Sequence, residues 1–152
     1  MDAQHKNHLL NILDLPDEIL LIIFNKLNMV DVLNSLTDVC KRFDQLIFDP
    51  FYIRNLNMTS MTTNSFYERT YVVDEQVLER ICGNILPRIR HQVNELIVEQ
   101  ESIERVLYAF NYPQLYSLTF MHFDIRRVMQ HIPGKLFSFT SIKIKVISRD
   151  II

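Results

Sequence analysis

An apolar segment near the start of the chain predicts a helix that is hydrophobic on more than one side. Pro16 suits a first helical position, because its fixed φ is helical and its missing N–H would be unpaired there. Asp17 and Glu18 follow, where the helix dipole favours negative charge. Residues 19–24 are then apolar without interruption, and Leu27 closes the predicted helix. A helix that is apolar all round has to be covered on more than one side.

Two interpretations of this helix are open. It is either the central helix of a larger all-α core, or it packs on one side and presents its other side to a partner. In the second case its apolar residues are anchors for a groove on that partner.

Two shorter helices are predicted downstream. The first opens near Asp31, and the second begins near Val39, with further apolar residues at Phe43, Leu46 and Ile47. Asp49-Pro50 stops it, because proline disfavours the helical conformation of the residue before it. A short aromatic turn or helix over 50–56 then ends the first domain.

Five short segments stand in order along this stretch: Leu-Pro-Asp-Glu-Ile at 15–19, Ile-Phe-Asn-Lys-Leu at 23–27, Asp-Val at 31–32, Val-Cys-Lys-Arg-Phe at 39–43 and Asp-Pro at 49–50. With these segments the stretch resembles the F-box family, over about a third of the chain. Many members carry tryptophan where this chain has Phe43, and phenylalanine is a common substitute there.

The resemblance implies a substrate-receptor subunit of an SCF-type cullin–RING ubiquitin ligase. Such a protein is not an enzyme; it binds a Skp-type adaptor through the F-box and a target protein through a second domain. The residues expected to bind the adaptor are Leu15, Pro16, Glu18, Ile19, Ile22, Ile23, Phe24, Leu27, Val32, Val39, Cys40 and Phe43.

The middle of the chain predicts a polar linker and a helix. Residues 57–65 are polar and of low complexity, and a strand is expected within 66–73. Asp74 is the expected cap of a helix that Pro87 ends. The apolar residues of this helix follow helical spacing at Val77, Leu78, Ile81, Cys82 and Ile85.

Beyond Pro87 the chain repeats a strand-then-helix pattern. Ser102 and Asp124, the expected helix caps, lie 22 residues apart, and a third strand with Phe139, Ile142 and Ile144 follows after 24 residues. The positions that repeat at 22 residues are Val93, Leu96, Val98, Ile103, Val106, Leu107 and Phe110, answered by Leu115, Leu118, Phe120, Ile125, Val128, Met129 and Ile132.

This pattern resembles a degenerate leucine-rich repeat from Val93 onward. Glu101, Phe123 and Ile147 stand where that family usually has asparagine, and the alternative is a small α/β domain with two similar units. A capping unit is missing after the third strand, which suggests a short or truncated member. The target is expected on the exposed face of the sheet, at Glu95, Glu99, Gln114, Tyr116 and Lys143.

The composition of the chain limits the classes of function that it can have. With 48% hydrophobic and 22% charged residues the chain is globular, and its net charge of −2 argues against a general nucleic-acid binder. Residues 121–152 carry a net charge of +4, on positions that alternate with apolar residues and are expected to be solvated. No export signal and no apolar run long enough to span a membrane are found, so a cytosolic or nuclear location is expected.

Candidate catalytic chemistry is sparse. The two glycines, Gly83 and Gly134, build no phosphate-binding loop, and the five histidines show no metal-ligand spacing. Cys40 and Cys82 are expected to be small buried hydrophobic residues in a reducing compartment. A cysteine-dependent enzyme would need an accessible, electropositive Cys40. No metal or cofactor is predicted.

The predicted fold is α+β or α/β: a three-helix F-box domain over 9–56, a linker over 57–73, and a leucine-rich-repeat-like solenoid over 74–152. Two rival functions stay open, a non-catalytic scaffold that works outside ubiquitination and a stand-alone interaction domain whose first helix is simply core.

Overall fold

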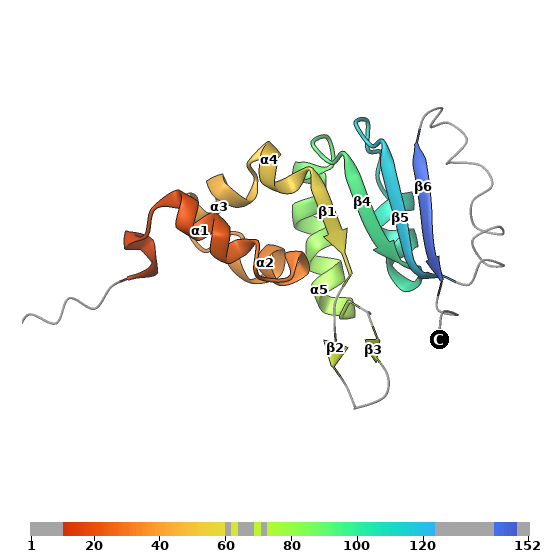
Figure 1. The fold of residues 1–152 in the computed structure, drawn as a ribbon, viewed down its shortest axis with the longest axis horizontal. Coiled ribbons are helices and arrows are strands. Elements are labelled where there is room, and N and C mark those ends of the chain that lie inside the picture. Colours follow the sequence, from red (N-terminus) through yellow and green to blue (C-terminus); the bar gives the residue numbers. More distant parts are fainter. Residues whose placement is uncertain (1–10, 60–61, 64–68, 71–72, 124–141, 149–152) are drawn as a thin grey trace, which may run out of the picture.

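The computed structural model describes residues 11–59, 62–63, 69–70, 73–123 and 142–148, and its first part is helical. The helices gather at one end of the molecule, next to a sheet (Figure 1). They are a 3-10 turn η1 (Ile12–Asp14) and the helices α1 (Asp17–Phe24), α2 (Met29–Leu36), α3 (Lys41–Ile47) and α4 (Pro50–Ile53).

Side-chain caps set several helix boundaries. Asn28 accepts a hydrogen bond from the backbone N–H of Val30, so α2 starts two residues before the predicted Asp31. Asp49 caps α4 in the same way through the N–H of Phe51, with Pro50 at the first helical position. These oxygens satisfy helical donors that would otherwise be unpaired.

A parallel sheet follows the helices, in the order β1-β4-β5-β6. The predicted mixed α+β architecture is therefore confirmed. The sheet strands are β1 (Asn55–Met58), β4 (Glu95–Glu99), β5 (Ser117–Phe123) and β6 (Lys143–Ser148), and a separate antiparallel pair is formed by β2 (Thr62–Thr63) and β3 (Arg69–Thr70).

The 22-residue repeat of the sequence appears in the structure as the pairing of β4 with β5. Leu96 lies opposite Leu118, and Val98 lies opposite Phe120. The third strand departs from the prediction, because Ile144 pairs with Leu118 where Ile142 was expected. A shift by two residues keeps the same side chains on the same face, so the apolar pattern does not distinguish the two registers.

The helix after Asp74 is longer than predicted. Asp74 caps it through the N–H groups of Gln76 and Val77, as expected. Pro87 does not end it, because a π-helical turn precedes the proline and shifts the backbone hydrogen-bonding register. Three consecutive segments form this helix: α5 (Glu75–Arg80), the π turn η2 (Ile81–Ile85) and α6 (Leu86–Ile89).

The segment after β4 is also less regular than predicted. It consists of a 3-10 turn η3 (Gln100–Ser102) and a π turn η4 (Glu104–Tyr108). Ser102 does not cap a helix; its hydroxyl donates to the carbonyl of Glu99 at 3.2 Å. The corresponding helix expected after Asp124 lies outside the described residues.

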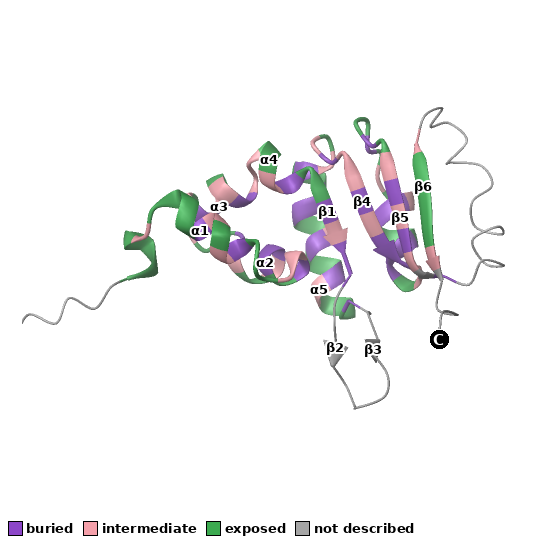
Figure 2. Ribbon diagram, in the orientation of Figure 1, coloured by how far each residue is buried: buried purple, intermediate pink, exposed green. Residues whose placement is uncertain are grey.

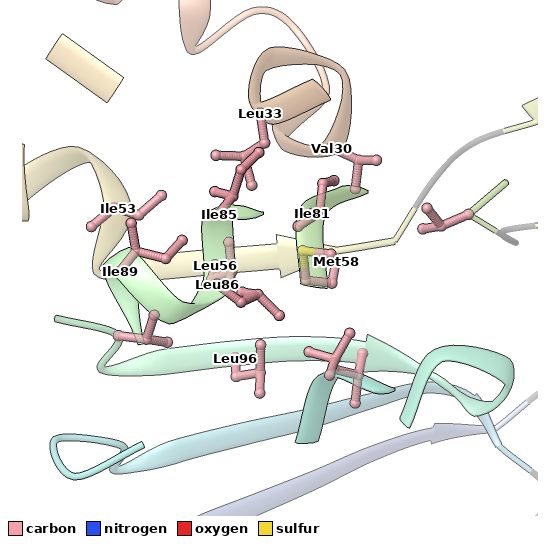
Figure 3. Close-up of a cluster of buried hydrophobic side chains, with 14 of the residues drawn as sticks. Val30, Leu33, Ile53, Leu56, Met58, Ile81, Ile85, Leu86, Ile89 and Leu96 are labelled. Atoms are coloured by element: carbon pink, nitrogen blue, oxygen red, sulfur yellow. The ribbon is translucent and has the colours of Figure 1, made fainter. Parts of the chain in front are cut away.

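One hydrophobic core joins the helical part to the sheet. Val30 and Leu33 of α2, Ile81 and Ile85 of η2, and the strand β1 meet in it (Figure 3). Strand β1 was not predicted, and it crosses the expected boundary between 56 and 57. The division into an F-box domain, a linker and a repeat region stays a prediction.

Candidate docking surface

Helix α1 is packed on one side and open on the other. Leu20 and Phe24 are 0% and 1% exposed, whereas Ile19 and Ile22 are 41% and 56% exposed. Figure 2 shows the exposed part of α1 on the outside of the helical end. Because Ile19 and Ile22 are three positions apart, they are neighbours on the helix surface. Helix α1 is therefore not simply a core helix.

Three of the predicted adaptor-binding residues lie in the core beneath this face. The rings of Phe24 and Phe43 pack edge to face at 5.4 Å, and Tyr52 packs against Phe24 at 6.4 Å. Phe24, Val32 and Phe43 are all buried. Direct contact of these three with a partner would require the core to open, so they belong to the hydrophobic core and not to the open face of α1.

The remaining predicted adaptor-binding residues differ in how far they are exposed. Leu27 and Val39 are exposed, and so are Pro16 and Glu18. The residues that are half-buried are Leu15, Ile23 and Cys40. Two exposed aliphatic residues of η1, which the sequence pattern did not single out, are Ile12 and Leu13.

Arg42 on α3 fixes the chain just before α1. Its Nε and Nη2 atoms donate to Oδ1 of Asp17 at 2.8 and 2.6 Å. Its Nη1 donates to the carbonyl of Leu13 at 2.5 Å, and Nη2 also donates to the carbonyl of Leu15 at 2.6 Å. The planar fork of arginine suits such a set of acceptors. Sequence reasoning missed this role, since its acceptors lie 25 to 29 positions away.

A second set of contacts joins the α2–α3 turn to the long helix α5–α6. Asp38 adopts a left-handed backbone conformation, with φ of 63°. Its carboxylate pairs with Arg88 at 3.1 Å, and the guanidinium of Arg88 lies 4.1 Å from the ring centre of Phe48. Arg80 donates to the carbonyl of Thr37 at 3.4 Å. The helical end is thus tied to the part of the chain that carries the sheet.

The predicted target-binding residues are divided between surface and interior. Gln114, Tyr116 and Lys143 are exposed, and Glu95 is half-buried and accepts a hydrogen bond from the Tyr116 hydroxyl. Glu99 is buried, which contradicts its expected place on an exposed face.

Glu99 is held by one hydrogen bond in an apolar setting. Its Oε1 accepts from the backbone N–H of Val73 at 2.6 Å, whereas Oε2 has no hydrogen-bond partner. Burial raises the pKa of Glu99 from 4.5 to about 7. The nearby charge of Glu101 also raises this pKa, whereas the Val73 hydrogen bond lowers it. Desolvation disfavours the charged carboxylate and so accounts for the direction of this change.

Other chemistry is limited in the described part of the chain. No cluster of three or more His, Cys, Asp or Glu side chains there is arranged to hold a metal ion. Burial raises the pKa of the Cys82 thiol to about 11, so this thiol is protonated at neutral pH. None of the helices in the described ranges combines the length and hydrophobicity needed to cross a bilayer.

The helical unit presents an open aliphatic helix face, and its core is continuous with that of the parallel sheet. Residues 12–59 match the family model described as F-box-like. The chain therefore carries an F-box-like domain, which comprises the helical part and β1. No curated protein matches the chain.

Proposed function

We propose that this chain is a substrate-receptor subunit of an SCF-type cullin–RING ubiquitin ligase. In this role its F-box-like domain binds a Skp-type adaptor and its sheet region binds a target protein. The chain performs no bond chemistry; it holds the target near the conjugating enzyme and raises the effective concentration there. The observation that supports this proposal is the uncovered aliphatic face of α1 in a domain with a closed core.

In this proposal the adaptor contributes an apolar groove that covers α1. Ile19 and Ile22 are the central anchors, and Leu27 lies just beyond the end of the helix. Helix-in-groove binding uses such residues spaced three or four positions apart. Pro16 and Glu18 set the start of the helix. Contacts at the margin of the groove would come from Leu15, Ile23, Val39 and Cys40, and also from Ile12 and Leu13.

The target would bind on the solvent-facing side of the sheet. Glu95 and Lys143 each pair with Ser117, so they belong to one row across three strands, with Tyr116 beside it. The leucine-rich-repeat-like interpretation of 93–147 belongs to this proposal and is supported by the parallel register of the strands.

Adaptor affinity tests the proposal. Calorimetric titration of the whole chain with a Skp-type adaptor is expected to give a saturable complex. Ile22→Ala should weaken it by about 2 kcal/mol, or roughly 30-fold, as expected for a central anchor. Ile144→Ala is the matched control, because Ile144 is an isoleucine of similar exposure on β6. Equal affinity of all three proteins, or no complex at all, would refute adaptor docking by α1.

A scaffold that works outside ubiquitination is the second candidate, because adaptor binding alone is compatible with both roles. A reconstituted ligase separates them. A receptor is expected to promote ubiquitin transfer to a captured target, and Ile22→Ala should remove that transfer. A scaffold would bind the adaptor and leave transfer unchanged.

A further inference from the structure

Two rows of apolar side chains cross one face of the sheet and reach β6. On β1, β4 and β5 these side chains are at most 1% exposed, but on β6 Ile144 and Val146 are 47% and 37% exposed. Among the described residues, the hydrophobic face is therefore less covered at β6 than at the other three strands, and β6 is exposed along most of its length in Figure 2. Strand pairing aligns the rows as Leu56, Leu96, Leu118 and Ile144, and as Met58, Val98, Phe120 and Val146.

The backbone of β6 is also available at this edge. Within the described ranges, no strand pairs with the side of β6 that faces away from β5. The N–H of Lys143 donates to the carbonyl of Tyr116 on the β5 side, at 2.8 Å. Successive residues of a parallel strand direct their backbone groups to opposite sides, so those of Ile144 and Val146 point to the open edge. Such a row of unpaired groups is a template for another strand.

The positive charge on the other face of β6 determines which kind of partner segment is favoured. Lys143 and Lys145 are exposed at alternating positions, and neither belongs to an ion pair of the described residues. Like charges opposite each other disfavour the pairing of two copies of this edge. Residues 121–152 carry a net charge of +4 in a chain whose net charge is −2. An acidic partner is therefore favoured.

We propose that β6 accepts an acidic, extended segment of a target protein as an additional strand. In that segment, carboxylate side chains alternate with aliphatic ones. The aliphatic residues would continue the two apolar rows beyond Ile144 and Val146, while the carboxylates would lie beside Lys143 and Lys145. Main-chain hydrogen bonds would supply affinity, and the alternating side chains would supply specificity. This inference names the target chemistry of the proposed receptor, and it does not depend on adaptor docking.

A labelled peptide tests this proposal on the whole chain. The probe is a fluorescein-labelled ten-residue peptide of alternating Glu and Val, with an alternating Lys and Val peptide as the charge control. Fluorescence anisotropy is expected to show saturable binding of the acidic peptide and at least about tenfold weaker binding of the basic one. The double variant Lys143→Glu/Lys145→Glu should reverse that preference.

A backbone variant tests whether binding uses the edge itself. Val146→Pro removes an N–H that points away from β5, which a strand at a sheet edge tolerates. Val146→Thr keeps that N–H and the β-branched shape, and is the matched control. Val146→Pro is expected to lose the acidic peptide, and Val146→Thr to keep it, with unchanged circular dichroism in both.

Several results would overturn the proposal. They are equal binding of both peptides, retained binding by Val146→Pro, binding of an RNA oligonucleotide but not of the peptide, and a dimer that Val146→Pro dissociates without any peptide binding. Ile22→Ala separates this proposal from the proposed function, because it should weaken adaptor binding and leave peptide binding unchanged.

Discussion

Glu99→Gln is expected to stabilise the protein at neutral and alkaline pH. The glutamine keeps an oxygen that accepts from the N–H of Val73, and it removes a buried negative charge whose other oxygen has no partner. The pKa of Glu99 is about 7 in the folded protein, against 4.5 for the ordinary side chain. At 1.36 kcal/mol per pKa unit, ionisation of this group in the folded protein costs about 3 kcal/mol above pH 7.

The sign of the pH dependence follows from proton linkage. The folded state holds the Glu99 proton more tightly than the unfolded state does, so the free energy of unfolding decreases as pH rises through the window between 4.5 and about 7. Glu99→Gln lacks this dependence. Its advantage over the unaltered protein should therefore grow by about 3 kcal/mol between roughly pH 4 and pH 8, whatever the constant effect of the new amide.

Urea denaturation, followed by circular dichroism across that pH range, measures this difference. Glu79→Gln is the control, because Glu79 is exposed on α5 and its substitution should change stability little at any pH. The reasoning would be refuted if the stability curves of Glu99→Gln and the unaltered protein ran parallel from pH 4 to pH 8.

Three further substitutions probe the helical part and the cap of α5. Phe24→Ala should lower the free energy of unfolding by about 3–5 kcal/mol in urea denaturation, because it opens a cavity beneath α1, whereas Ile22→Ala should lower it far less; equal losses would contradict the assigned orientation of the helix. Asp74→Ala should cost about 1 kcal/mol in the same assay, and Asp74→Asn should restore most of it, because either oxygen caps the helix; no loss would show that the cap is unimportant. Arg42→Lys should weaken adaptor binding several-fold in calorimetry with little change in circular dichroism, because lysine lacks the fork that holds the Leu13 and Leu15 carbonyls; unaltered affinity would show that Arg42 does not position the docking surface.

The helical part was predictable because its signals are local. The proline at the start of α1 and the Asp-Pro pair after α3 mark boundaries through backbone conformation alone. Which side of α1 is buried was not predictable, since residues 19–24 are apolar throughout. Phe24 faces the core because Phe43 of α3 and Tyr52 of α4 pack against it. For the same reason the predicted site included Phe24, Val32 and Phe43, which tertiary packing buries.

The sheet was only partly predictable. Strand β1 has the sequence Asn-Leu-Asn-Met, in which the buried Leu56 and Met58 alternate with polar residues. Its polar residues favoured a linker, although period-two alternation is a strand signal. At Pro87 the sequence predicted a helix end that the structure does not have. The helix continues because a π turn compensates for the hydrogen bond that proline cannot make. The role of Arg42 depends on a distant contact, which no local pattern contains.

Hydrogen exchange in the presence of a Skp-type adaptor tests the central claim most directly. The account predicts that saturating adaptor slows amide exchange across η1, α1 and the turn that carries Val39, while exchange in β6 is unchanged. Unchanged exchange in α1 at saturation, or slower exchange confined to the sheet, would contradict it.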